Sequence, residues 1–145
     1  MSSSKYLSEF NLKFTEALKY VEEVLKKINK YDTIIATKIE FMREYCKTPT
    51  CIVLANIIID HVLGDEELCH ELSIYNHKYF MNMDKKTYMK KCGNNKNAEK
   101  FYNILMDPMK DMEEKHIIII VKRFGYIINL CLAYQQALEE EKEEE

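Results

Sequence analysis

Two Glu-x-x-His spacings are the residues best suited to chemistry in this sequence. Glu67 precedes His70 by three positions, and Glu113 precedes His116 in the same way. On a helix this spacing places a carboxylate and an imidazole on one face, as in four-helix bundles that bind two iron or manganese ions. Such a centre also needs a glutamate from each of two further helices. The candidates for those two positions are Glu16, Glu40 and Glu44.

A surface location for both pairs is favoured over a metal centre. The chain holds 18 glutamates and 4 histidines in 145 residues, so two such spacings arise readily by chance. Glu67 and His70 also fall beside the expected apolar stripe of their helix rather than on it. We therefore predict surface or boundary residues at these four positions, and we expect no metal or other cofactor.

Five cysteines offer a second kind of chemistry. Their odd number and the absence of a C-x-x-C pair argue against a disulfide framework and against a zinc site. Cys92 is the one whose lysine-rich surroundings favour a thiolate. No phosphate-binding glycine loop or hydrolase motif occurs, so the sequence favours a protein without catalytic activity but leaves an enzyme open. The thiols are expected to be reduced, in the cytoplasm or nucleus. The cysteines are Cys46, Cys51, Cys69, Cys92 and Cys131.

A basic segment at residues 84–100 is the third candidate site. Its six lysines outnumber Asp84 and Glu99, and the segment has a helix–Gly–helix outline around Gly93. A helix-turn-helix of this kind presents lysines to nucleic-acid phosphates. The segment lacks arginine and the whole chain carries a net charge of −3, so nucleic-acid binding is an alternative to the main hypothesis. The lysines are Lys85, Lys86, Lys90, Lys91, Lys96 and Lys100.

The elements that position these residues are predicted to be helices. Three glycines and two prolines in the whole chain are too few for the turns of a β-rich fold. Apolar residues at steps of three and four predict helices over 5–30, 33–46 and 66–83, followed by shorter helices on either side of Gly93. Asp32, Asp65 and Asp84 are the expected N-caps. The sequence therefore predicts an all-α, single-domain bundle of about six or seven helices.

Two of the predicted helices are apolar around most of their circumference and should form the core. They span about 49–63 and about 108–138, and each begins at a cap-then-proline pair, Thr48-Pro49 and Asp107-Pro108. Gly64 is expected to end the first of them in the left-handed conformation. Strands at 33–39 and 117–121 remain an alternative because both segments are β-branched. Polar and charged residues interrupt both apolar runs, so no membrane span is expected.

By elimination, the sequence favours a soluble helical protein–protein interaction module or a small subunit of a larger assembly. Its helical domain should cover 1–138, with an acidic tail at 139–145. The partner is expected to be another protein or a second copy of the chain. Its contact surface is predicted on the far end of the last helix, where few other elements remain to cover apolar side chains. The residues of that predicted surface are Tyr126, Leu130, Tyr134 and Leu138.

Overall fold

The computed structural model describes residues 2–144, and these residues form helices with no strand among them. The prediction of an all-α, single-domain fold is confirmed. More elements are present than the six or seven expected, because the helix predicted over 66–83 is divided and short π-helical and 3-10 segments precede α8. The elements are α1 (Ser3–Lys27), α2 (Thr33–Cys46), α3 (Val53–His61), α4 (Glu66–Ser73), α5 (His77–Met81), α6 (Lys85–Lys91), α7 (Lys96–Phe101), a π-helical turn η1 (Tyr102–Met106), a 3-10 helix η2 (Asp107–Asp111) and α8 (Glu114–Glu143).

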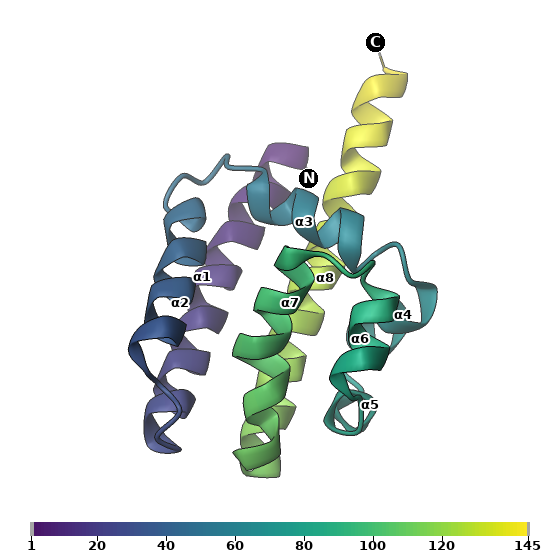
Figure 1. Cartoon of the computed structure of the whole chain (residues 1–145). Coiled ribbons are helices and arrows are strands. Elements are labelled where there is room, and N and C mark those ends of the chain that lie inside the picture. The colour runs from purple at the N-terminus through teal and green to yellow at the C-terminus, as the bar shows by residue number, and fades with distance from the viewer. Residues whose placement is uncertain (1, 145) are drawn as a thin grey trace.

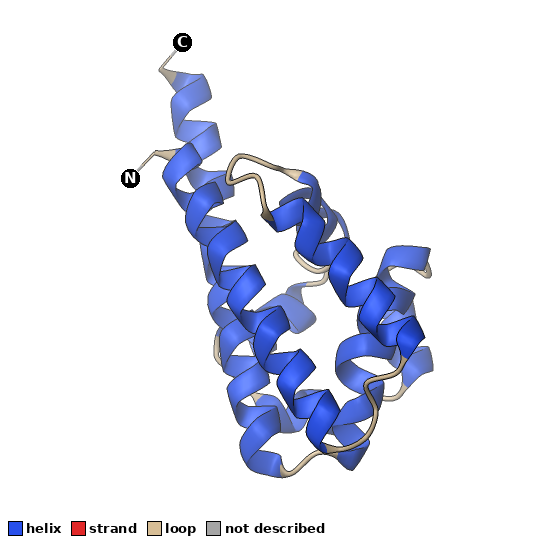
Figure 2. Ribbon diagram, turned by 90° about the vertical axis from the view of Figure 1, so that its left-hand side faces the viewer, coloured by secondary structure: helices blue, strands red, loops and turns tan. Residues whose placement is uncertain are grey.

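The helices lie in two layers, with α3 across one end (Figure 1). Seen as in Figure 1, the back layer contains α1, α8 and α4, and the front layer contains α2, α7 and α6; Figure 2 shows the two layers side by side. The long helices α1 and α8 run antiparallel. At one end the backbone N–H of Ser3 donates to Glu141 at 2.9 Å. At the other end Tyr20 Oη lies 3.0 Å from His116 Nδ1.

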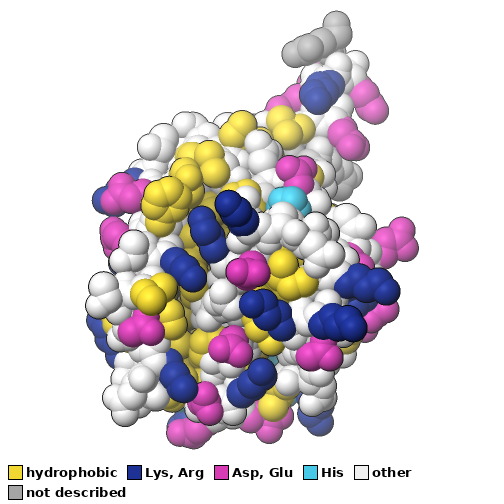
Figure 3. Space-filling view, in the orientation of Figure 1, with side chains coloured by type: hydrophobic (Ala, Val, Ile, Leu, Met, Phe, Trp, Pro, Cys, Tyr) yellow, Lys and Arg dark blue, Asp and Glu magenta, His cyan; other side chains and the backbone are white. Residues whose placement is uncertain are grey.

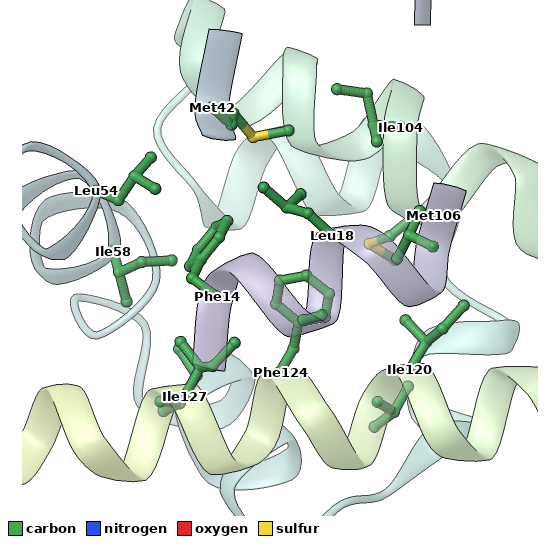
Figure 4. Packing of buried hydrophobic residues seen from close by; sticks show 14 of the residues in the cluster. Phe14, Leu18, Met42, Leu54, Ile58, Ile104, Met106, Ile120, Phe124 and Ile127 are labelled. Carbon is green, nitrogen blue, oxygen red and sulfur yellow. The ribbon is translucent and has the colours of Figure 1, made fainter. Parts of the chain in front are cut away.

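The core fills the space between the two layers (Figure 4). Phe14 and Leu18 of α1 are fully buried there, with Ile104 of η1 and Ile127 of α8. The ring of Phe14 meets the ring of Phe124 edge to face, with centroids 5.6 Å apart. Both α1 and α8 therefore direct one face inward and leave the opposite face on the back of the molecule.

Side-chain caps fix the starts of five helices and confirm three predictions. Ser2 Oγ caps α1 by accepting from the backbone N–H of Lys5 at 3.4 Å. The carboxylates of Asp32, Asp65 and Asp84 accept hydrogen bonds from the backbone N–H three residues further on, at 2.8, 2.8 and 2.7 Å. Asn95 does the same for α7 at 2.9 Å. Each such cap stabilises its helix by about 1 kcal/mol. The predicted bounds of 33–46 are those observed for α2.

The predicted helix 49–63 is shorter than expected. It begins at Val53 because the buried side chain of Asn11 donates from Nδ2 to the carbonyls of Pro49 at 2.8 Å and Cys51 at 3.0 Å. These bonds hold the preceding segment as a loop. The prediction that Gly64 adopts the left-handed conformation is wrong. In the part of the chain described, Gly93 is the glycine with a positive φ.

Two further predicted helices begin or end elsewhere. The helix predicted over 66–83 is broken between α4 and α5 by Tyr75, whose φ is 63°. The helix predicted from 108 begins at Glu114, because η2 and an extended Met112 come first. Both segments for which strands remained an alternative, 33–39 and 117–121, are helical.

Helix α8 is long and apolar enough, by length and composition alone, to cross a membrane. In this fold 56% of its most apolar 18-residue window is buried, which is the arrangement of a core helix. The helix continues through Glu143, so most of the segment predicted as an acidic tail is helical and projects beyond the body of the molecule (Figure 1).

Candidate functional site

An apolar groove of about 490 Å³ opens on the front layer. We call it the front groove. Figure 3 shows hydrophobic side chains gathered over this face, with lysine and arginine side chains beside them. Its lining includes Lys38, Phe41 and Tyr45 of α2, Val53 and Ile57 of α3, and Lys100 of α7.

Helix α2 carries a second apolar stripe, of which Phe41 and Tyr45 line the front groove while Ile34 lies outside its lining. Ile39 and Met42 face the core and are buried. Ile34 and Phe41 are seven residues apart and therefore share another face of the helix, where they are 66% and 59% exposed. Tyr45 follows one turn later, its ring meeting that of Phe41 edge to face with centroids 5.5 Å apart. The groove wall is thus a row of large apolar side chains that the fold leaves in contact with water.

The charge at the front groove is positive. Lys38 and Lys100 line the groove, and no carboxylate lines it with them. Lys100 Nζ lies 5.6 Å from the centroid of the Phe41 ring. Within residues 2–144 neither lysine has a carboxylate oxygen within 4.0 Å, in contrast with Lys47 and Lys91, which form ion pairs. Two unpaired cations beside an apolar surface are suited to a ligand that has both an apolar face and carboxylates next to it.

The structure does not assemble the two Glu-x-x-His pairs. Glu67 accepts a hydrogen bond from Tyr79 Oη at 2.8 Å, and partial burial together with this carboxylate raises the pKa of Tyr79 to about 12. Glu113 pairs with Lys115 at 3.4 Å, and His70 is exposed. Residues 2–144 contain no group of three or more histidine, cysteine or acidic side chains placed to hold a metal ion.

The six lysines of the basic segment do not form one unpaired stripe. Lys91 Nζ lies 3.7 Å from Asp65 and 3.6 Å from Glu67. Lys85 Nζ lies 3.9 Å from Glu99 and 6.0 Å from the centroid of the Tyr102 ring. Lys100 belongs to the front groove, while Lys86, Lys90 and Lys96 are exposed. Carboxylates therefore neutralise part of the positive charge that the sequence places here.

The four residues predicted as a partner surface are divided between surface and core. Tyr126 is 42% exposed, but Leu130 and Tyr134 are buried and Leu138 is half-buried. The cause is α1, which follows α8 as far as Glu141 and covers the end that the sequence analysis left open. The sequence analysis overlooked Ile34 and Phe41, although both stand off the Ile35/Ile39/Met42 stripe of their helix and thereby signalled a second apolar face.

Burial makes three of the five thiols poor nucleophiles. It raises the pKa of Cys46 and Cys92 to about 11 and that of Cys131 to about 12. The lysines around Cys92 therefore do not produce a thiolate, because the sulfur itself is buried beneath them. Cys51 and Cys69 are partly exposed.

We expect a thiol-specific reagent at pH 8 to modify Cys51 and Cys69 of the native protein first. The three buried thiols should react at least about a hundredfold more slowly than these two, because only a small fraction of each buried thiol is ionised and the reagent cannot reach the sulfur. The release of 2-nitro-5-thiobenzoate reports the reaction. It should show two rapidly reacting thiols per chain in buffer and five in denaturant. A fast native reaction at Cys92, located by peptide mapping, would contradict this assignment.

Two histidines in the part of the chain described lie within hydrogen-bond distance of side chains that can exchange a proton with them. Tyr20 Oη lies 3.0 Å from His116 Nδ1, and His77 Nε2 lies 2.9 Å from Glu114 Oε1, but among residues 2–144 neither histidine is hydrogen-bonded to a thiol or to a serine or threonine hydroxyl. The front groove, by contrast, offers apolar surface and unpaired positive charge in one place. Comparison of the chain with protein-family models, with curated proteins and with solved structures finds no match.

Proposed function

We propose that this protein is a protein–protein interaction module that holds an apolar segment of a partner protein in the front groove. The observation that carries the proposal is Phe41, which is 59% exposed at the edge of a hollow of about 490 Å³. Large exposed apolar side chains that are bordered by charge are characteristic of binding surfaces. Aromatic side chains in such positions often supply most of the binding energy.

The chemistry of the groove favours an amphipathic helix with carboxylates beside its apolar face. Residues 2–144 have no strand edge to which an extended peptide could add by backbone hydrogen bonds, and a groove between helices accepts the side chains of a helix instead. Lys38 and Lys100 then have carboxylates to pair with, and such charge-assisted bonds also fix the orientation of the bound helix.

A single charge placed in the groove tests this function. The variant Phe41→Glu removes the aromatic ring and sets a carboxylate against partner carboxylates, so we expect the affinity for the partner to fall by about tenfold or more. The partner is captured from native cells by crosslinking, then purified and titrated against wild-type protein and variants by calorimetry. Circular dichroism should show unchanged helix content, because Phe41 is exposed.

Leu12→Glu is the matched control, since Leu12 is also an exposed apolar residue but lies on the back layer. It should leave the affinity of the purified partner unchanged. Equal affinities for wild-type protein and Phe41→Glu would contradict a role for the front groove. Loss of binding in Leu12→Glu alone would place the partner on the opposite face.

A further inference from the structure

The back layer carries a second exposed apolar surface, formed by α1 and α8. Leu12 of α1 is 53% exposed, and α8 exposes Ile119 and Tyr126. A hollow of about 430 Å³ lies between the two helices, with Tyr75 on its border. No other described element covers this side of the pair (Figures 1 and 2). We call this surface the back face.

The two helices of the back face carry opposite net charge where they line the hollow. On α1, Lys13 lies 4.0 Å from Glu9 and 3.3 Å from Glu16, so the three charges sum to −1. On α8, Lys122 and Arg123 add two positive charges, and among residues 2–144 neither has a carboxylate within 4.0 Å. Arg123 instead lies over the Tyr20 ring. The next exposed charges along α1, Lys19 and Glu23, cancel.

From these observations we propose that the back face binds a second copy of the chain, with α1 of each copy lying on α8 of the other. A symmetric dimer requires a surface that is complementary to itself under a two-fold rotation. A two-fold axis parallel to the helices places α1 of one copy over α8 of the other. The net negative charge of each α1 then faces the positive charge of the other copy's α8. An axis perpendicular to them would set α1 against α1 and bring Glu9 towards Glu16 of the partner copy.

The intrachain register supports this arrangement. Because Ser3 lies beside Glu141 and Tyr20 beside His116, Glu16 lies at about the level of Lys122 and Arg123 of its own chain. Rotation about an axis parallel to the helices preserves this level. Glu16 of one copy therefore comes to Lys122 and Arg123 of the other, and Leu12 comes close to Tyr126.

The available area is that of a stable dimer. Helix α1 has 25 residues and is therefore about 37 Å long. Two adjacent helices are about 20 Å wide, which gives a face of about 700 Å² per copy. A standard protein interface buries about 800 Å² per partner. The product would be a four-helix bundle of two α1 and two α8 helices, a common packing arrangement.

Charge reversal provides the test, read out by sedimentation velocity and native mass spectrometry. Wild-type protein should form a dimer. Glu16→Lys sets a lysine against Lys122 of the other copy, and Lys122→Glu sets a glutamate against its Glu16. Each variant alone should therefore have a dimer affinity at least about tenfold lower than that of wild-type protein. An equimolar mixture of the two variants should form a heterodimer, because both contacts between positions 16 and 122 then join opposite charges. Both residues are exposed, and circular dichroism verifies that the variants fold.

Two controls identify the surface and the axis. Phe41→Glu, on the front layer, should dimerise like wild-type protein. Glu16→Lys alone should dimerise more weakly than wild-type protein, whereas an α1-on-α1 dimer would be strengthened by this substitution, because the new lysine would then face Glu9 of the partner copy. Interfaces of this size bind with micromolar or tighter affinity, so wild-type protein that is still monomeric at about 100 μM would overturn the proposal. Loss of the dimer in Phe41→Glu would overturn it as well, by placing the contact in the front groove.

Discussion

Replacing Gly125 with alanine is expected to destabilise the fold by about 2 kcal/mol. A Cβ atom at this position would lie 2.3 Å from the carbonyl oxygen of Leu72 and 2.4 Å from Cδ1 of Tyr75. Relieving both contacts moves the end of α4 away from α8, and overpacking of this kind costs about 3 kcal/mol or somewhat more. Against this, alanine favours a helix interior over glycine by about 1 kcal/mol. The steric cost is the larger of the two effects.

Urea denaturation followed by circular dichroism measures this loss, and hydrogen exchange locates it. Protection should fall first in the α4–α5 turn, where Asn129 Nδ2 donates to the Ser73 carbonyl at 3.3 Å. Gly64→Ala is the matched control, because its Cβ would meet nothing closer than the Asp60 carbonyl at 3.5 Å. That variant should be unchanged or more stable by about 0.4–1 kcal/mol. Equal stabilities for the two variants would show that α4 does not depend on the close approach at Gly125.

The helices that could be predicted from sequence are those whose ends are determined locally. Asp32, Asp65 and Asp84 each cap a helix through a hydrogen bond only three residues away. Such a contact depends on residue type and spacing, both of which are visible in the sequence. The same holds for the all-α class, because the shortage of turn residues is a property of composition.

The features that could not be predicted depend on contacts between distant residues. Thr48-Pro49 resembles a helix start, but the Asn11 amide, about forty positions away, binds the Pro49 and Cys51 carbonyls and delays the helix. Tyr75 adopts a positive φ that tyrosine rarely takes, and it lies where only the absence of a side chain at Gly125 admits its ring. No local pattern indicates either contact.

The front groove was not predicted from the sequence, and the partner surface predicted on α8 is only partly exposed, for a related reason. An apolar α8 does have exposed side chains, and Tyr126 is one of them. Its far end, however, is covered by α1, because an antiparallel partner of 25 residues reaches from Tyr20 at His116 to Ser3 at Glu141. The periodicity of one helix shows how much apolar surface it has, but its neighbours decide which part remains exposed.

Alanine substitutions of two leucines of α1 distinguish the contributions that the inner and outer faces of this helix make to stability. Leu18 is fully buried and lies near Met42, Ile104 and Met106 (Figure 4). Leu18→Ala removes packed methyl groups and leaves a cavity, so the free energy of unfolding should fall by about 2–5 kcal/mol. Leu12 is 53% exposed on the same helix, and Leu12→Ala should change the free energy of unfolding of the monomer by about 0.5 kcal/mol or less.

Measuring the melting temperature at low and at high protein concentration extends this comparison to the back face. Association stabilises the folded chain by mass action, so a dimer gives a melting temperature that rises with concentration. We expect that rise in wild-type protein and in Phe41→Ala, and we expect Leu12→Ala to lose most of it. Leu18→Ala should melt lower at every concentration, because its defect lies within one chain. If Leu12→Ala instead melted as low as Leu18→Ala in dilute solution, Leu12 would be part of the core rather than of a contact surface.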